Sequence, residues 1–467
     1  MQVPILSGTF ADGTGDFRTR YPRNLVPVPK QNGISNGYLR PADGFEQFTL
    51  GDGNVRGGNT WNGMPYYVSG NSLIQVHADG SRTVLGAIPG NDQVSVDYSF
   101  DRLIISADNK LFYWSSGTGL NQVVDPDLGA CIDAIWLAGF TITTDGTSLV
   151  VTDLGDPVQV NPLKYGSSEA DPDPVKGLKR LRTEFYAINR HTCELFELVG
   201  GTLFPFQRNE GAQLQRGALG THCVAVFNDA LAFLGSGRKE APAVWAGNNG
   251  STVKLSTREV DTILETYTEA ELAASVMETR AFKNHQLLYL HLPDQVLVYD
   301  EPASRAVQEP VWYTLDSGVT ELATYRARYF QWAFGKWICG DPTSATIGVV
   351  NDGISSHYGQ AVGWEFGTTI LYNEGRGGII HQMELACLPG RVAFGANPVV
   401  WTSFSDDGET WSQEWTCYAG MQGDRRKRLT WLDQGDLTNW RIQRFRGTSD
   451  AHLSFARLEL EMEALDV

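Results

Sequence analysis

Residues 66–85, YYVSGNSLIQVHADGSRTVL, contain the pattern that decides the fold. Three short runs rich in aromatic, β-branched and other apolar residues are separated by the pairs Gly70-Asn71 and Asp79-Gly80. Gly, Asn and Asp tolerate the positive φ that tight hairpin turns require, whereas the intervening runs favour extended backbone. The stretch therefore predicts a meander of antiparallel strands.

The same pattern recurs along most of the chain, for example in DRLIISADNKLFYW (101–114) and GFTITTDGTSLVVTD (139–153). The repeating units begin near residues 66, 100, 139, 184, 223, 283 and 329. Their mean spacing of about 44 residues is the length of a four-stranded propeller blade. The units share no WD or kelch signature. We predict an all-β chain with a β-propeller of about six or seven blades over residues 38–361.

Three segments depart from this pattern. Residues 1–37 carry Gly, Pro, Asn and Asp every few positions, which favours an extended N-terminal arm. Residues 256–278 show helical spacing of Val260, Ile263 and Leu264, followed by a capping-box pair, Thr268 and Glu271, and predict a small helical insertion. Residues 362–467 contain longer strand-like runs with looser connections and predict a C-terminal β-sandwich-like domain.

Composition bounds the function. The 467 residues exceed one compact core, and 42% of them are hydrophobic. The formal charge of −17 repels phosphate, so DNA could pass the protein without specific binding. The first residues, MQVPILSGTF, lack the features of a secretory signal, and the sequence predicts no membrane helix. We expect a protein made and folded in the cytoplasm, with its six scattered cysteines reduced and mostly buried.

Motifs that could carry chemistry favour structural roles. SDDGETW (405–411) resembles the Asp-box of sialidase-like propellers, which is itself a hairpin motif. A glycosidase would need two carboxyl groups facing each other across a pocket. The acidic residues here instead lie in the polar stretch SSEADPDP (167–174) or at predicted turns, at Asp52, Asp79, Asp108 and Asp145.

The remaining candidates give no complete site. His285 and His291 lack a third ligand at metal-site spacing, and Cys131, Cys223 and Cys339 lack a neighbouring histidine that would activate a thiolate. The chain also has no nucleotide-binding loop and no GxSxG motif. We predict that the protein is not an enzyme. We also predict that it has no catalytic, cofactor-binding or metal-binding residues and needs no cofactor. The dense basic run 425–428 favours a solvated loop or a salt-bridge patch between subunits.

One region resembles a known family. SVMETRAFKNHQLLYLHLPDQVLVYD (275–300), with TYTEAELAASVMET (266–279) before it, is similar to the packaged-DNA stabilisation protein, or tail accessory factor, of short-tailed phages of enteric bacteria. Further similar segments follow the same order: SNGYLRPADGF (35–45), GTHCVAVFNDALAFLG (220–235) and ICGD (338–341). The likeness covers about residues 15–360 and is weak beyond 362.

The resemblance implies a structural virion protein of the tail. Six copies would form a homo-hexameric ring, the hub, below the portal and its adaptor ring. This ring would close the DNA channel after packaging and anchor tailspikes or tail fibres and the tail needle, without membrane contact. The alternative from the fold alone is a carbohydrate- or receptor-binding propeller, which would need an axial pocket lined by aromatic residues and carboxylates. A generic propeller used as an interaction platform is a third hypothesis.

Overall fold

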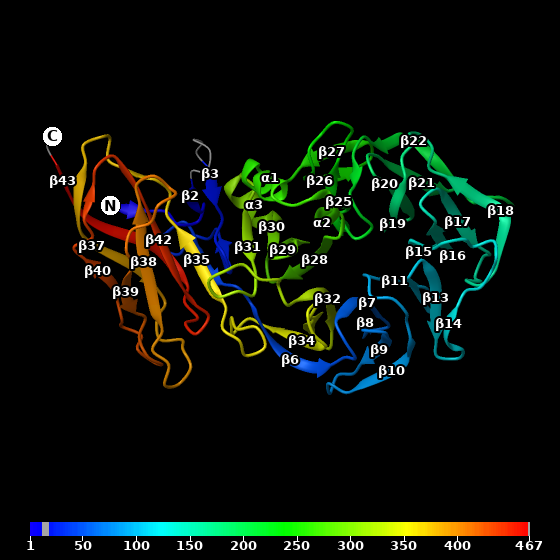
Figure 1. Cartoon of the computed structure of the whole chain (residues 1–467), viewed down its shortest axis with the longest axis horizontal. Coiled ribbons are helices and arrows are strands. Elements are labelled where there is room, and N and C mark those ends of the chain that lie inside the picture. The colour runs from blue at the N-terminus through cyan, green and yellow to red at the C-terminus, as the bar shows by residue number, and fades with distance from the viewer. Residues whose placement is uncertain (12–17, 466–467) are drawn as a thin grey trace.

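The computed structural model describes residues 1–11 and 18–465. Two domains lie side by side, a ring of radially arranged sheets and a two-layer stack of sheets (Figure 1). Both chain termini lie in the layered domain, at one end of the molecule (Figure 1). The predicted fold class, a β-propeller with a C-terminal β-sandwich, is confirmed.

Seven sheets form the ring within the described residues, and six of them are built in the same way. The chain begins each of these blades on the inner side and proceeds outward through antiparallel neighbours; in the fifth blade the first two short strands both pair with the third. These blades consist of β7 (Val55–Trp61), β8 (Met64–Ser69), β9 (Ser72–Val76) and β10 (Arg82–Ala87); β11 (Ser95–Tyr98), β12 (Leu103–Ala107), β13 (Lys110–Ser115) and β14 (Gly119–Gln122); β15 (Asp133–Leu137), β16 (Phe140–Thr144), β17 (Ser148–Thr152) and β18 (Val160–Ser167); β19 (Val175–Leu181), β20 (Glu184–Asn189), β21 (Cys193–Leu198) and β22 (Phe206–Leu214); β23 (Gly217–Ala218), β24 (Val224–Phe227), β25 (Ala230–Ser236), β26 (Ala243–Asn248) and β27 (Ser251–Lys254); and β28 (Val276–Phe282), β29 (His285–His291), β30 (Val296–Asp300) and β31 (Trp312–Leu315).

The seventh blade joins two distant parts of the chain. It contains β32 (Arg328–Ala333), β33 (Lys336–Gly340) and β34 (Thr346–Asn351), and its outer strand is β6 (Gly44–Leu50). Residues 35–45, which precede the first blade in the sequence, thus lead into the outer strand of the last one. Hydrogen bonds between β34 and β6 therefore close the ring without a covalent link. The blade count is seven, the upper of the two predicted values.

Hairpin turns follow the local chemistry seen in the sequence. Asp108 and Asn109 adopt φ of 50° and 55°, and Gly70 and Gly80 adopt 55° and 82°. Positive φ at these positions lets consecutive strands reverse without splaying. The turns predicted at these positions are confirmed.

Helices interrupt the strands at two places. Helices α1 (Arg258–Glu265) and α2 (Glu269–Ala273) lie between the fifth and sixth blades, and the Thr268 and Glu271 side chains form the predicted capping box of α2. A third helix, α3 (Glu301–Val307), connects β30 to β31 and was not anticipated. The Asp300 side chain caps its first turn, and the left-handed Gln308 ends it.

The sandwich combines strands from both ends of the chain. Its first sheet contains β4 (Leu25–Val28), β5 (Tyr38–Pro41), β43 (Phe455–Ala464), β37 (Gly378–Cys387) and β40 (Leu429–Leu432), with β1 (Gln2–Val3) and β41 (Asp436–Leu437) at its margins. Its second sheet contains β35 (Gly363–Gly367), β36 (Leu371–Tyr372), β38 (Val399–Ser405), β39 (Trp415–Tyr418) and β42 (Trp440–Thr448). A short hairpin, β2 (Thr9–Ala11) and β3 (Arg18–Arg20), lies beside it.

The segment expected as an N-terminal arm lies against its own chain. Val3, Ile5 and Leu25 are buried in the sandwich core together with Phe445 and Phe455. The segment also bridges the two domains at the start of β4, where backbone N–H groups bond to Glu365 of the sandwich and Thr314 of the propeller. These contacts couple the sandwich to the ring.

Candidate functional site

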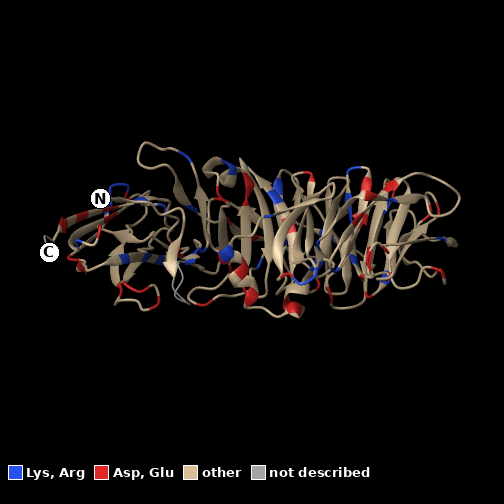
Figure 2. Cartoon of the chain, turned by 90° about the horizontal axis from the view of Figure 1, so that it is seen from above, with Lys and Arg blue, Asp and Glu red and all other residues tan. Residues whose placement is uncertain are grey.

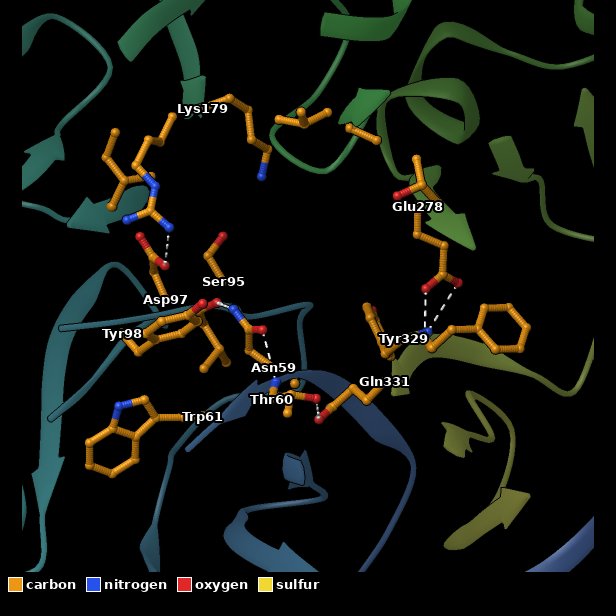
Figure 3. Close-up of a pocket in the computed structure, with 18 of the residues that line it drawn as sticks. Asn59, Thr60, Trp61, Ser95, Asp97, Tyr98, Lys179, Glu278, Tyr329 and Gln331 are labelled. Carbon is orange, nitrogen blue, oxygen red and sulfur yellow. Dashed lines mark hydrogen bonds and ion pairs between the residues drawn. The ribbon is translucent and has the colours of Figure 1, made fainter. Parts of the chain in front are cut away.

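A cavity of about 1000 Å³ lies on the axis of the propeller (Figure 3). The innermost strands of all seven blades contribute to its wall, and each contacts the next around the ring. An axial cavity is the usual location for a ligand in a propeller, so its polar groups decide what it could do.

Two aspartates in the wall connect successive blades. Asp97 of β11 accepts a hydrogen bond from the backbone N–H of Trp136 in β15, at 2.7 Å. Asp133 of β15 accepts one from the backbone N–H of Leu178 in β19, at 2.8 Å. Burial raises the pKa of Asp97, although this bond and the nearby Arg180 favour its charged form. Each carboxylate therefore holds two neighbouring blades together, and we call such residues staples.

A glutamate has the same role on the opposite side of the ring (Figure 3). Glu278 of β28 accepts hydrogen bonds from the backbone N–H groups of Tyr329 and Phe330 in β32, at 3.0 and 2.8 Å. The Nε2 atom of His291 lies 2.7 Å from Glu278 Oε1, and burial lowers the pKa of this histidine. The carboxylate is therefore held by two backbone N–H groups of the next blade, with the His291 ring beside it.

Side-chain amides complete the set of contacts between blades. Asn59 donates to the Val96 carbonyl at 2.9 Å, which connects the first blade to the second. Gln331 donates to the Tyr66 carbonyl at 2.9 Å, which connects the seventh blade to the first. The second contact reinforces the ring on the side where β6 completes the last blade.

Aromatic side chains form another part of the wall. Trp61 donates its indole N–H to the Ser99 carbonyl at 3.0 Å, and Trp332 and Trp337 lie edge to face with ring centroids 5.4 Å apart. Phe100 is 87% exposed. These rings provide apolar contact area near the cavity.

The carboxylates of the cavity wall are hydrogen-bonded to the backbone, and its histidine is uncharged at neutral pH. Burial together with nearby Lys179 lowers the pKa of this histidine, His222, to about 4. Across the described part of the chain, no group of three or more His, Cys, Asp or Glu side chains is arranged to hold a metal ion. The geometry of these carboxylates supports a role in holding neighbouring blades together.

The stapling residues were not identified from the sequence. Asp97, Asp133 and Glu278 each lie in an innermost strand, and this position becomes apparent only once the strands are assigned to blades. An acidic residue within the first strand of a unit is the signal that could have found them.

The Asp-box-like segment forms a hairpin loop between β38 and β39. Asp407 accepts hydrogen bonds from the backbone N–H groups of Glu409 and Thr410, at 2.8 and 2.7 Å. Bonds from the Thr410 hydroxyl and from these N–H groups hold the pKa of Asp407 well below its usual range. Trp411 lies under the Arg444 guanidinium, at 4.1 Å. The loop is therefore structural, as the sequence favours.

The other sequence candidates also have local partners. Asp79 and Asp145 accept hydrogen bonds from backbone N–H groups two residues further on, as turn aspartates do. His285 contacts Asp300, the residue that caps α3. It lies on the same strand as His291, but His291 contacts a different carboxylate, that of Glu278.

All six cysteines are free thiols, and Cys131, Cys193, Cys223 and Cys339 are buried. Burial raises the pKa of Cys131, Cys223 and Cys339 to about 12, so these thiols stay protonated at neutral pH. They serve as small apolar core residues.

Comparison with known proteins identifies related sequences over nearly the whole chain. A family model described as bacteriophage P22 Gp10, beta-propeller, matches residues 1–355, and one described as bacteriophage P22 Gp10, beta-sandwich, matches residues 363–463. The tail hub protein gp10 of Salmonella phage P22 is 30% identical over 384 residues, which cover 76% of this chain and 78% of that protein.

Solved structures share only a distant likeness in fold. The Pan2 WD40 domain of Neurospora crassa superposes with a TM-score of 0.42 and 11% identity, over 66% of this chain and 95% of that chain. Kluyveromyces lactis Hsv2 gives a TM-score of 0.38 and 7% identity, over 69% and 95%. Both scores are below 0.5.

Proposed function

The chain belongs to the bacteriophage P22 Gp10 family, and from this premise we propose that it is a structural subunit of a phage tail hub, located in the tail of the virion. The observation that carries the proposal is the match of both domains, in order, together with 30% identity over 78% of the P22 tail hub protein. A structural role agrees with an axial cavity whose carboxylates are used as staples between blades.

We further propose a homo-hexameric ring of these subunits below the portal and its adaptor ring. In this position the ring would close the DNA channel after packaging and anchor tailspikes or tail fibres and the tail needle. Two properties support the proposal. Seven blades joined by hydrogen bonds make a rigid body that can bear load, and a net charge of −17 disfavours DNA adhesion while the genome passes.

Charged residues of both signs are distributed over both domains (Figure 2). No helix among residues 1–11 and 18–465 is long and apolar enough to cross a membrane.

The alternative function, binding of carbohydrate or of a receptor, has one observation in its favour. Aromatic side chains, among them Trp61 and Trp332, line the axial cavity. The carboxylates that would bond sugar hydroxyl groups are instead bonded to the backbone, which weakens this alternative. A glycan array with the intact protein tests it, because specific binding that is lost in a Trp332→Ala variant would favour the alternative.

The tail-hub proposal is tested on particles and on the purified chain. We expect mass spectrometry of purified virions to detect the chain, and electron microscopy to show a six-fold ring once the portal–adaptor complex is added. A chain that is missing from virions, or that stays monomeric with that complex, would refute the proposal.

A further inference from the structure

A groove of about 710 Å³ lies where the sandwich meets the propeller. One wall includes Lys283 and Asp352 of the sixth and seventh blades. The other wall is formed by the end of β37 and the loop after it, by the basic run 425–428, and by residues 452–456. The groove therefore brings the basic run together with residues that are far away in the sequence.

Positive charge is concentrated in this groove although the chain as a whole is acidic. Seven Lys and Arg side chains line it, but only two carboxylates, Glu384 and Asp352, do so. The cationic residues are Arg40, Lys283, Arg391, Arg425, Arg426, Lys427 and Arg428.

Three of these cations already have carboxylate partners. Arg428 contacts Glu384, Lys283 Nζ lies 2.7 Å from Asp352, and Arg40 lies 2.8 Å from Asp43.

The other four cations have no carboxylate partner within the described part of the chain. They are Arg391, Arg425, Arg426 and Lys427, and the Arg425 guanidinium donates to the Pro389 carbonyl, at 3.5 Å. These four cations line the same groove, and its two carboxylates already pair with other cations, so an anionic ligand would offset the repulsion among the four.

A titratable group in the groove responds to the same positive charge. His452, which lines the groove, has its pKa lowered by burial, with further contributions from Arg391 and Arg40. The groove also exposes apolar side chains, because Leu388 is 56% and Ile34 is 48% exposed. A complementary ligand would carry both carboxylates and apolar side chains.

We propose that this groove binds an extended acidic peptide segment, with interspersed apolar residues, from a partner protein. The groove has the size of a ligand or short-peptide site. A specific duplex DNA interface buries about 1,000–2,500 Å² of protein surface, and the acidic remainder of the chain would oppose such a footprint. Because the walls come from both domains, the bound segment would also fix the sandwich relative to the propeller. The inference stands on the groove itself and does not depend on the tail-hub proposal.

The test measures fluorescence anisotropy of a labelled peptide with the repeated sequence Glu-Glu-Leu, titrated with the full chain. The groove variant is Arg426→Glu with Lys427→Glu. The matched control is Lys239→Glu with Arg376→Glu, which changes the charge equally at exposed residues that do not line the groove. We expect about tenfold weaker binding for the groove variant and less than about twofold for the control.

Other outcomes would overturn the inference. Equal weakening in both variants would show that the peptide responds only to net charge. Tighter binding of a labelled 20-base-pair duplex, lost in the groove variant, would assign the groove to DNA. Self-association of the chain that disappears in the groove variant, seen by analytical ultracentrifugation, would assign it to a second copy. Circular dichroism of both variants checks that they are folded.

Discussion

Closure of the ring by β6 can be tested at Phe45. This side chain is fully buried and lies in the core between the sixth and seventh blades. Its ring centroid is 4.7 Å from that of His357, 5.5 Å from that of Tyr325 and 5.9 Å from that of Tyr358. Phe45→Ala removes these contacts from the one strand that completes the last blade.

The magnitude follows from this environment. Phe→Ala in a core lowers the free energy of unfolding by about 3–5 kcal/mol, and the loss is largest where neighbours cannot collapse into the cavity. Tyr325 and His357 are themselves buried, and the His357 ring is held by a 2.8 Å hydrogen bond between its Nδ1 and the Ser317 hydroxyl. We therefore expect a loss of about 4 kcal/mol in the stability of the propeller.

Urea unfolding measures this loss, and hydrogen exchange read by mass spectrometry locates it. Amides of β34 that bond to β6 should exchange faster in the variant, whereas those of β42 in the sandwich should not. Phe394→Ala is the matched control, because Phe394 is 93% exposed. A loss below about 1 kcal/mol, or one no larger than in the control, would refute the role of β6 as the closing strand.

Three further predictions address other parts of the ring. Glu278→Ala should lower the free energy of unfolding by about 2–4 kcal/mol in urea titrations, because it leaves the Tyr329 and Phe330 N–H groups without an acceptor. Glu278→Gln keeps an acceptor oxygen and should lower this free energy less. Gly235→Ala should lower the melting temperature, because the new Cβ would lie 1.8 Å from the Gly217 carbonyl oxygen. Gly211→Ala is the control, since its Cβ would meet only the Asn209 side chain, at 3.5 Å. Equal melting temperatures of the two variants would contradict the tight approach of β23 and β25. Burial and nearby Arg326 lower the pKa of His357 to about 3. Below pH 6.5 the histidine of the unfolded chain therefore binds a proton that the folded chain does not bind, and the free energy of unfolding falls as the pH approaches 3. At pH 5 this free energy is lower by about 2 kcal/mol. Urea titrations across this range should give a shallower pH dependence for His357→Gln, and an identical dependence would contradict the assignment.

The repeat series and the site differ in how far the sequence reveals them. Seven strand-and-turn units are visible because hairpin turns depend on adjacent residues such as Asp108 and Asn109, whose backbone preferences are local. The staples Asp97, Asp133 and Glu278 are not visible, because each bonds to a backbone N–H of the next blade, roughly 40 to 50 residues away in the sequence.

The sequence by itself therefore determined the strand meander, the helical insertion with its capping box, the family resemblance and the absence of a recognisable catalytic motif. Only the tertiary structure decided that β6 completes the seventh blade, that β1 and β4 join the sandwich, and that the basic run faces Lys283 across a groove. The physical reason is the range of the interactions. Turns and helix caps depend on neighbouring residues. Ring closure, sheet membership and the positive charge of a groove depend on residues that only the folded chain brings together.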